Sequence, residues 1–130
     1  MLKNFGYAGV HHDENFSVNV ILENPADYHL KADTIVFGVT FNINNAGAII
    51  PKMGDFKFYI MDESGYLHNT RSISCTKSET EATTDDDGEP IRRPDALIHT
   101  YFKHKFLFQN LRIAFYYKHY GDISIIKMAH

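Results

Sequence analysis

The residue types that are scarce in this sequence restrict its function first. Its 130 residues include one cysteine, Cys75, and no tryptophan. A single cysteine excludes an internal disulfide, and we expect Cys75 to be a small, half-buried hydrophobic side chain. Exposed tryptophan is the usual platform for stacking on sugars, so its absence ranks a sugar-binding module below a protein-binding one.

Long apolar runs and strong net charge are also missing. No stretch approaches the roughly 18 apolar residues of a membrane-spanning helix, and residues 1–10 contain no segment suited to a secretion signal. The formal net charge of −3 at pH 7 argues against a nucleic-acid-binding protein, which usually has a basic surface. We therefore expect neither a membrane span nor a nucleic-acid partner, and the composition leaves the localisation open.

The chain has no recognisable catalytic or cofactor motif. Ser-His-Asp, Cys-His, paired-carboxylate and glycine-rich phosphate-binding patterns do not stand out. The 8 histidines lack the HxH or HExxH spacing of metal sites, and the adjacent His11 and His12 would point to opposite faces of a strand. We expect no catalytic residues, no cofactor and no metal. The alternative is a small enzyme whose site is assembled only by the fold.

What the chain does contain is the alternation of β-strands. Large apolar residues stand at every second position in one long run: Ile35, Phe37, Val39, Phe41 and Ile43. A period of two places all of them on one face of an extended strand. Similar alternation recurs in other segments: 16–23, 55–61, 66–75, 100–108, 111–117 and 123–128. These segments predict an all-β, antiparallel sandwich of seven or eight strands in a single domain, residues 1–130, with a closed barrel as the alternative.

One segment, residues 76–93, breaks this pattern. It has almost no apolar residue and several carboxylates: Glu79, Glu81, Asp85, Asp86, Asp87 and Glu89. We expect a solvated, mobile acidic loop that exceeds the usual length of a connection. An EF-hand loop for Ca²⁺ needs acidic residues at alternate positions, whereas Asp85, Asp86 and Asp87 are consecutive. The sequence therefore favours a solvated loop over a Ca²⁺ site.

Three segments together resemble a known family. Residues 39–47 combine a strand with an Asn-x-Gly turn, residues 56–66 have the pattern of a hairpin with an Asp-x-x-Gly-aromatic turn, and residues 111–125 look like a closing strand pair. They are similar to a bacterial immunoglobulin-like family, small domains of unknown function in secreted proteins and lipoproteins of Gram-positive bacteria. The resemblance implies an immunoglobulin-like sandwich and an extracellular or cell-surface location once a leader is removed. Without the resemblance, a cytoplasmic location is expected. It carries over no catalytic residues.

Tyrosines beside basic residues provide the candidate binding site. Tyr101 and Lys103 share one phase of the segment 100–108, while Arg112 and Tyr116 share the outward phase of 111–117. If the two strands are neighbours, these four residues form an exposed aromatic–basic face, and Tyr and Arg are favoured at interface hot spots. We therefore expect a non-catalytic binding or interaction module that engages a protein partner or a second copy of the chain.

Overall fold

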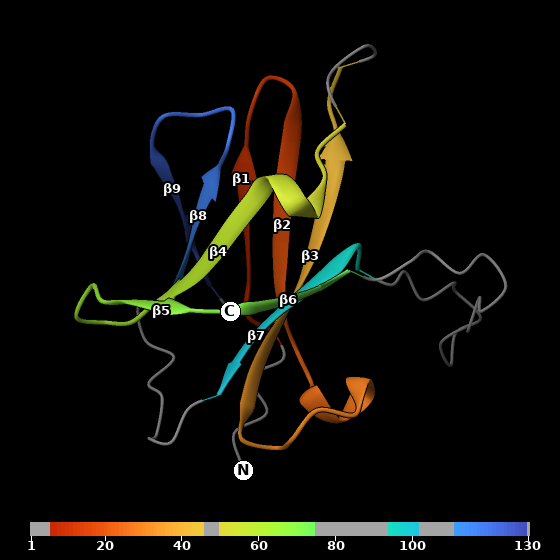
Figure 1. Ribbon diagram of the computed structural model, residues 1–130, viewed down its shortest axis with the longest axis vertical. Helices are drawn as coiled ribbons and strands as arrows, with labels where there is room; N and C mark the ends of the chain where they lie inside the picture. The colour runs from red at the N-terminus through yellow and green to blue at the C-terminus, as the bar shows by residue number, and fades with distance from the viewer. Residues whose placement is uncertain (1–5, 46–49, 75–93, 102–110, 130) are drawn as a thin grey trace, which may run out of the picture.

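The computed structural model describes residues 6–45, 50–74, 94–101 and 111–129. Within these ranges it contains nine strands, two short 3-10 helices and no α-helix. The strands form two antiparallel sheets that pack face to face (Figure 1), which confirms the predicted all-β sandwich. The predictions for Cys75, for the acidic segment 76–93 and for most of the strand at 100–108 lie outside the described residues.

The larger sheet has five strands in the order β1-β2-β3-β7-β6. They are β1 (Ala8–His12), β2 (Phe16–Glu23), β3 (Thr34–Ile43), β7 (Ala96–Tyr101) and β6 (Arg71–Ser74). The longest strand pairing in this sheet joins β2 and β3, with Phe16 opposite Ile43 at one end and Glu23 opposite Val36 at the other. The 3-10 helix η1 (Pro25–Tyr28) lies in the connection from β2 to β3. The Asn24 side chain caps η1 by accepting from the amide of Ala26 at 3.1 Å, and β2 ends just before Asn24 and Pro25.

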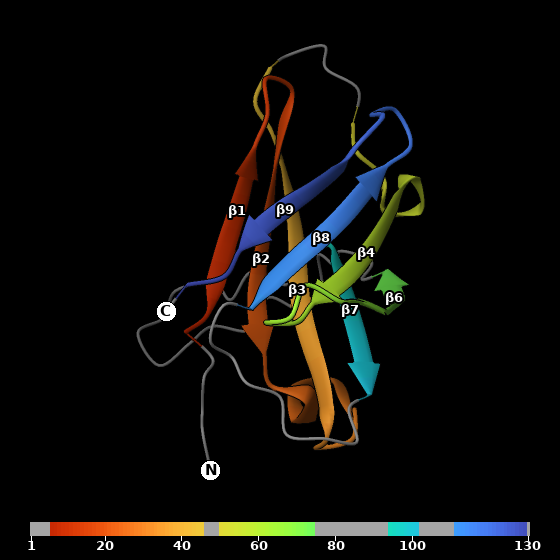
Figure 2. The same ribbon diagram turned by 90° about the vertical axis from the view of Figure 1, so that its left-hand side faces the viewer.

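The smaller sheet has four strands in the order β5-β4-β8-β9. They are β5 (Leu67–Asn69), β4 (Phe56–Met61), β8 (Arg112–Tyr117) and β9 (Ile123–Lys127), and the 3-10 helix η2 (Met53–Asp55) leads into β4. Figure 2 shows β9, β8 and β4 lying side by side and running diagonally across the larger sheet behind them. One face of this sheet therefore covers the core and the other faces outward.

The core is formed by the alternating apolar residues of both sheets. Its largest fully buried side chains come from β2, β3, β4, β7, β8 and β9: Phe16, Phe37, Phe115, Ile60, Ile98, Ile113 and Ile126. At one end the packing is aromatic, because the ring of Phe56 stacks on Tyr117 with centroids 4.4 Å apart and on Phe41 at 4.8 Å. Burying a large apolar side chain contributes about 1.5–3 kcal/mol, so these residues account for the strand alternation seen in the sequence.

The two sheets are connected along both sides. On one side β5 continues into β6 through Thr70, whose hydroxyl donates to the carbonyl of Phe58 over 2.7 Å. On the other side β1 lies beside β9 (Figure 2), and Ala8 and Ala129 exchange two backbone hydrogen bonds of 2.9 Å. Gly9 permits this approach, since a Cβ atom there would lie 2.5 Å from the carbonyl oxygen of Lys127. We call this second junction the β1–β9 seam.

The described strands are more numerous than the seven or eight predicted. One added strand is β1, whose residues include Gly9 and two histidines and therefore alternate only weakly. The other comes from the segment 66–75, which was predicted as one strand. It instead divides at Thr70 into β5, which pairs with β4, and β6, which pairs with β7 in the other sheet.

Candidate functional site

The predicted aromatic–basic face does not form as one surface. Tyr101 ends β7, which lies between β3 and β6 in the five-stranded sheet, whereas Arg112 and Tyr116 lie on β8 in the four-stranded sheet. The two strands are therefore not neighbours, as the prediction required: β7 pairs with β3 and β6, and β8 pairs with β4 and β9. The backbone of Tyr101 lies opposite Thr34, and Lys103 lies outside the described residues. Only Tyr116 and Arg112 remain together.

These two residues belong to a larger surface that the register defines. Lys57 and Ile123 flank Tyr116, Tyr59 and Ile125 flank Ala114, and Met61 and Lys127 flank Arg112. Because alternate residues point to the same side, these rows share the side of the sheet away from the core. We call this surface the outer face. It consists of Lys57, Tyr59, Met61, Leu67, Asn69, Arg112, Ala114, Tyr116, Ile123, Ile125 and Lys127.

The outer face exposes a continuous group of apolar side chains. Relative exposure is 40% for Tyr116, 47% for Ile123 and 41% for Ile125. Ala114 also points outward but is completely buried. Single exposed apolar residues are normal on protein surfaces, whereas a contiguous group of them marks a place of interaction.

All charges on the outer face are positive. The outward positions of the four strands include Lys57, Arg112 and Lys127 and no carboxylate. Lys57 lies over the ring of Tyr59, with its Nζ 5.3 Å from the ring centroid. Arg112 is fixed in place because its Nη2 donates to the carbonyl oxygen of Asp62 over 2.9 Å. Its Nε is buried and has no hydrogen-bond partner among the described residues.

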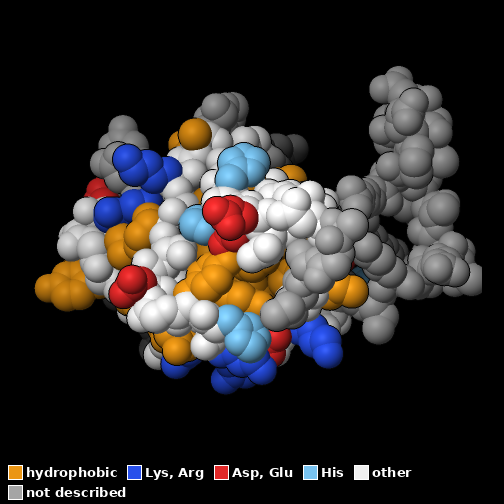
Figure 3. Space-filling model, turned by 90° about the horizontal axis from the view of Figure 1, so that it is seen from above, with side chains coloured by type: hydrophobic (Ala, Val, Ile, Leu, Met, Phe, Trp, Pro, Cys, Tyr) orange, Lys and Arg blue, Asp and Glu red, His pale blue; other side chains and the backbone are white. Residues whose placement is uncertain are grey.

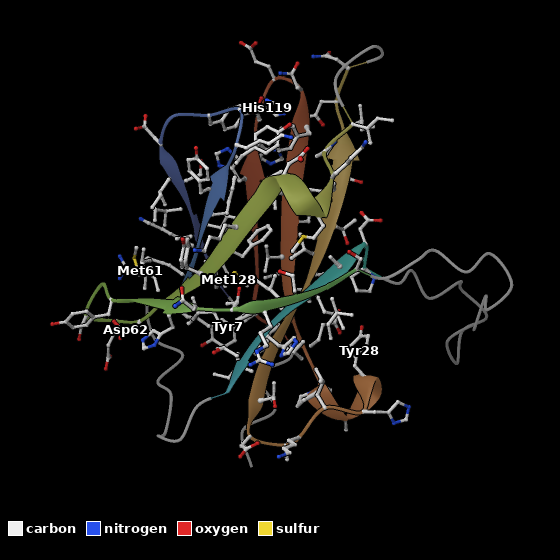
Figure 4. The ribbon with its side chains drawn as sticks, in the orientation of Figure 1. Tyr7, Tyr28, Met61, Asp62, His119 and Met128 are labelled. Carbon is white, nitrogen blue, oxygen red and sulfur yellow. The ribbon has the colours of Figure 1, made fainter. Side chains whose placement is uncertain are left out.

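Asp62 organises the hairpin that anchors Arg112. Its Oδ1 accepts from the amides of Ser64 and Tyr66 at 2.9 and 3.0 Å, and its Oδ2 lies 2.9 Å from Nε2 of His68. The hydrogen bond with His68 is the main reason that the pKa of the Asp62 carboxyl lies below its usual value. Figure 4 shows Met61 and Asp62 at this hairpin on the left of the view, well away from His119 near the top. An imidazole–carboxylate pair can orient a catalytic base, but here the carboxylate also closes a turn.

A second polar cluster lies where the β1–β2 turn meets the end of β3. The hydroxyl of Tyr120 donates to Oδ2 of Asp13, and Nδ2 of Asn44 donates to the carbonyl oxygen of Asp13 at 2.7 Å. Nδ1 of His12 lies 3.2 Å from Oγ of Ser17. Figure 3 looks down on this end and shows histidine and acidic side chains around an exposed apolar surface. Ser17 is buried and is also bonded to Asn44. The cluster therefore joins three segments of the chain, namely the β1–β2 turn, the end of β3 and the segment of Tyr120.

The histidines that drew attention in the sequence do not combine. His11 packs its ring edge-on against Phe115 in the core, with centroids 5.2 Å apart, while His12 turns to Ser17 on the other side of the sheet. Across the described ranges, no group of three His, Cys, Asp or Glu side chains is placed to hold a metal ion. The same ranges contain no helix with the length and apolar character needed to cross a membrane.

Comparison with known proteins adds no relative. No family model matches the chain, and no curated protein or solved structure matches it. The sandwich is therefore described from its own strands, and the resemblance to the bacterial immunoglobulin-like family stays a prediction. Sequence reasoning placed Tyr116 and Arg112 on the same side of one strand but did not assign the rest of the outer face, because β4 lies beside β8 only through long-range pairing.

Proposed function

We propose that this protein is a non-catalytic interaction module that binds a protein partner through the outer face. The observation that supports this most is the contiguous exposed apolar group formed by Tyr116, Ile123 and Ile125. Tyr is enriched among the residues that dominate binding energy, since it offers a large rigid surface and a polar hydroxyl.

The arrangement of the outer face also resembles that of an interface. Its exposed apolar side chains lie beside cations: Lys57 shares the row of Tyr116 and Ile123, Ile125 lies in the next row, and Arg112 and Lys127 lie in the row after that. Protein interfaces commonly have an apolar centre inside a polar rim. A rigid sheet supports these side chains, so little ordering free energy is lost when a partner binds.

Affinity capture with matched variants tests the proposal. The double variant Tyr116→Ser/Ile125→Ser removes the apolar centre, and Val10→Ser/Ile21→Ser makes a comparable change on exposed residues of the other sheet. We expect proteins captured from source cells by the wild type to be retained by the second variant and lost from the first. Circular dichroism and thermal melting verify the fold of both. Equal capture by both variants would show that the outer face is not the binding surface.

A further inference from the structure

The charges of the outer face indicate what kind of partner fits it. On the basis of the proposed function, we infer that the partner is an acidic protein segment in which carboxylates flank apolar side chains. The outward positions supply cations of one sign only, and like-charge contacts at an interface are unfavourable while opposite charges increase both rate and specificity. The apolar centre and the cations thus require two different features of the same partner.

The rows of the sheet set the spacing of those features. Lys57 lies in the row of Tyr116 and Ile123, and Arg112 lies with Lys127 two rows further on. Positions four residues apart on a strand are roughly 13 Å apart, at about 3.3 Å per residue. An extended partner segment with carboxylates about four residues apart and apolar residues between them would meet the cations of both rows, with its apolar residues beside Tyr116, Ile123 and Ile125.

Arg112 is the best positioned of the three cations. Its guanidinium is held by the carbonyl oxygen of Asp62, and Asp62 is itself fixed by His68 and the turn amides. A guanidinium with a fixed orientation loses little side-chain entropy on binding and forms strong bonds to carboxylates. The side chain is also half-buried, where screening by solvent is weaker than at the two exposed lysines.

A second copy of the chain fits the outer face poorly. A two-fold axis along the strands would place the row of Arg112 and Lys127 against itself. A two-fold axis across the strands would place that row against the row of Lys57. Both isologous arrangements bring cations together and leave them without carboxylates from the strands. The observations therefore favour an acidic segment of another protein.

Nucleic acid also fits less well than an acidic protein segment. Binding to a phosphate backbone depends on many cations, whereas the outer face has three and the chain has a net charge of −3. Ile123 and Ile125 would be left largely exposed by a phosphate backbone. A protein segment can bury these isoleucines and pair the cations at once.

Selection from a random peptide library displayed on phage tests the inference directly. The immobilised wild-type protein is the target, and the selected peptides are then titrated in solution against three proteins: wild type, Lys57→Glu/Lys127→Glu and Tyr116→Ser/Ile125→Ser. We expect peptides rich in Asp or Glu together with apolar residues. Their affinity should fall at least about tenfold in the charge-reversed variant and again between 0.05 and 0.3 M salt, because charge contacts are screened. If charge reversal impairs folding, Lys57→Gln/Lys127→Gln replaces it.

The outcomes separate the inference from the proposed function. Peptides that bind Tyr116→Ser/Ile125→Ser as tightly as wild type would overturn the proposed function itself. Peptides that need Tyr116 and Ile125 but show no acidic enrichment, and bind the charge-reversed variant equally well, would overturn only the acidic partner. Selection of basic peptides would do the same. Light scattering behind a sizing column provides the last check, since a dimer abolished by Tyr116→Ser/Ile125→Ser would identify a second copy as the partner.

Discussion

The outward sides of the two sheets differ in charge and in the arrangement of their apolar residues. The five-stranded sheet carries both signs of charge, as Glu23, His99 and Arg71 lie in one row across β2, β7 and β6. Its Val36 and Leu97 point outward yet are buried, while its exposed Ile21 lies between rows that contain polar residues. The four-stranded sheet instead exposes adjacent apolar residues with cations only.

This difference shows how two sides of one sandwich can take different roles. On the five-stranded sheet, Gly38 leaves room for the Glu23 side chain, since a Cβ there would lie 2.7 Å from Oε1 of Glu23. Burial raises the pKa of the Glu23 carboxyl, and the Asp27 carboxylate adds to the shift. Burial also lowers the pKa of the His99 imidazole, with Arg71 adding to that shift. We expect this side to respond to pH and the outer face to respond to salt.

The largest difference in stability is expected between substitutions on the two sides of one strand, β8. Phe115 is buried in the core and its neighbour Tyr116 is exposed on the outer face. We expect Phe115→Ala to lower the free energy of unfolding by about 3–5 kcal/mol, and Tyr116→Ala to lower it by less than about 1 kcal/mol. Urea denaturation followed by circular dichroism measures both. Similar losses for the two variants would mean that Tyr116 is structural and that the outer face is not free.

The next largest effect is expected at the β1–β9 seam, which joins the two sheets. A methyl group at Gly9 would meet the Lys127 carbonyl oxygen at 2.5 Å and the Ile126 side chain at 2.6 Å. We expect Gly9→Ala to cost about 1–3 kcal/mol of stability through overpacking. Gly54→Ala is the control, because nothing lies within 4 Å of that position, and it should change stability by about 0.5 kcal/mol or less. Equal melting temperatures for both variants would show that the seam opens easily.

A smaller effect concerns His99 and acid. Because its pKa is lowered in the folded state, the folded protein resists its protonation. The contribution of His99 to stability is fully present above its unfolded-state pKa of about 6.5, and it declines as the pH falls below that value. We expect His99→Gln to make the melting temperature less dependent on pH between about 7 and 5, as measured by thermal denaturation. An unchanged pH profile would contradict the shift.

The smallest effect is expected at Glu23, with the opposite dependence on pH. Its raised pKa means that stability is greatest with the carboxyl protonated and declines as the pH rises through the folded-state value. We expect Glu23→Gln to raise stability near pH 7 by at most about 1 kcal/mol and to have no effect well below its ordinary pKa. Differential scanning calorimetry at several pH values measures this. A destabilised variant at neutral pH would show that the carboxylate has a favourable partner.

The sequence predicted local structure better than pairing. Alternation located β2, β4, β8 and β9 to within a residue or two, because each has apolar residues at every second position facing the core. It also assigned Tyr116 to the outward phase of β8. Alternation does not say which sheet a strand joins, so the aromatic–basic face was predicted only on the condition that the two strands are neighbours, and β7 and β8 belong to different sheets.

The parts that were missed depend on long-range or weak signals. The β1 strand has Gly9 where an apolar residue would be expected, and the reason lies in Lys127 and Ile126 at the other end of the chain. The outer face likewise combines Lys57 with Tyr116 and Ile123, and no local pattern determines the register between β4 and β8. The candidate site could be predicted only as the fragment formed by Tyr116 and Arg112.

The β1–β9 seam has a mechanical consequence. Ala8 and Ala129 lie directly opposite each other, and their paired hydrogen bonds form an isolated bridge beyond the end of β9. A pulling force applied at these two residues acts across the strands, so it loads this pair of hydrogen bonds directly. The two strands of the seam should therefore separate at low force. The opposite junction, where β5 passes into β6 through Thr70, is a continuous chain and cannot part in this way.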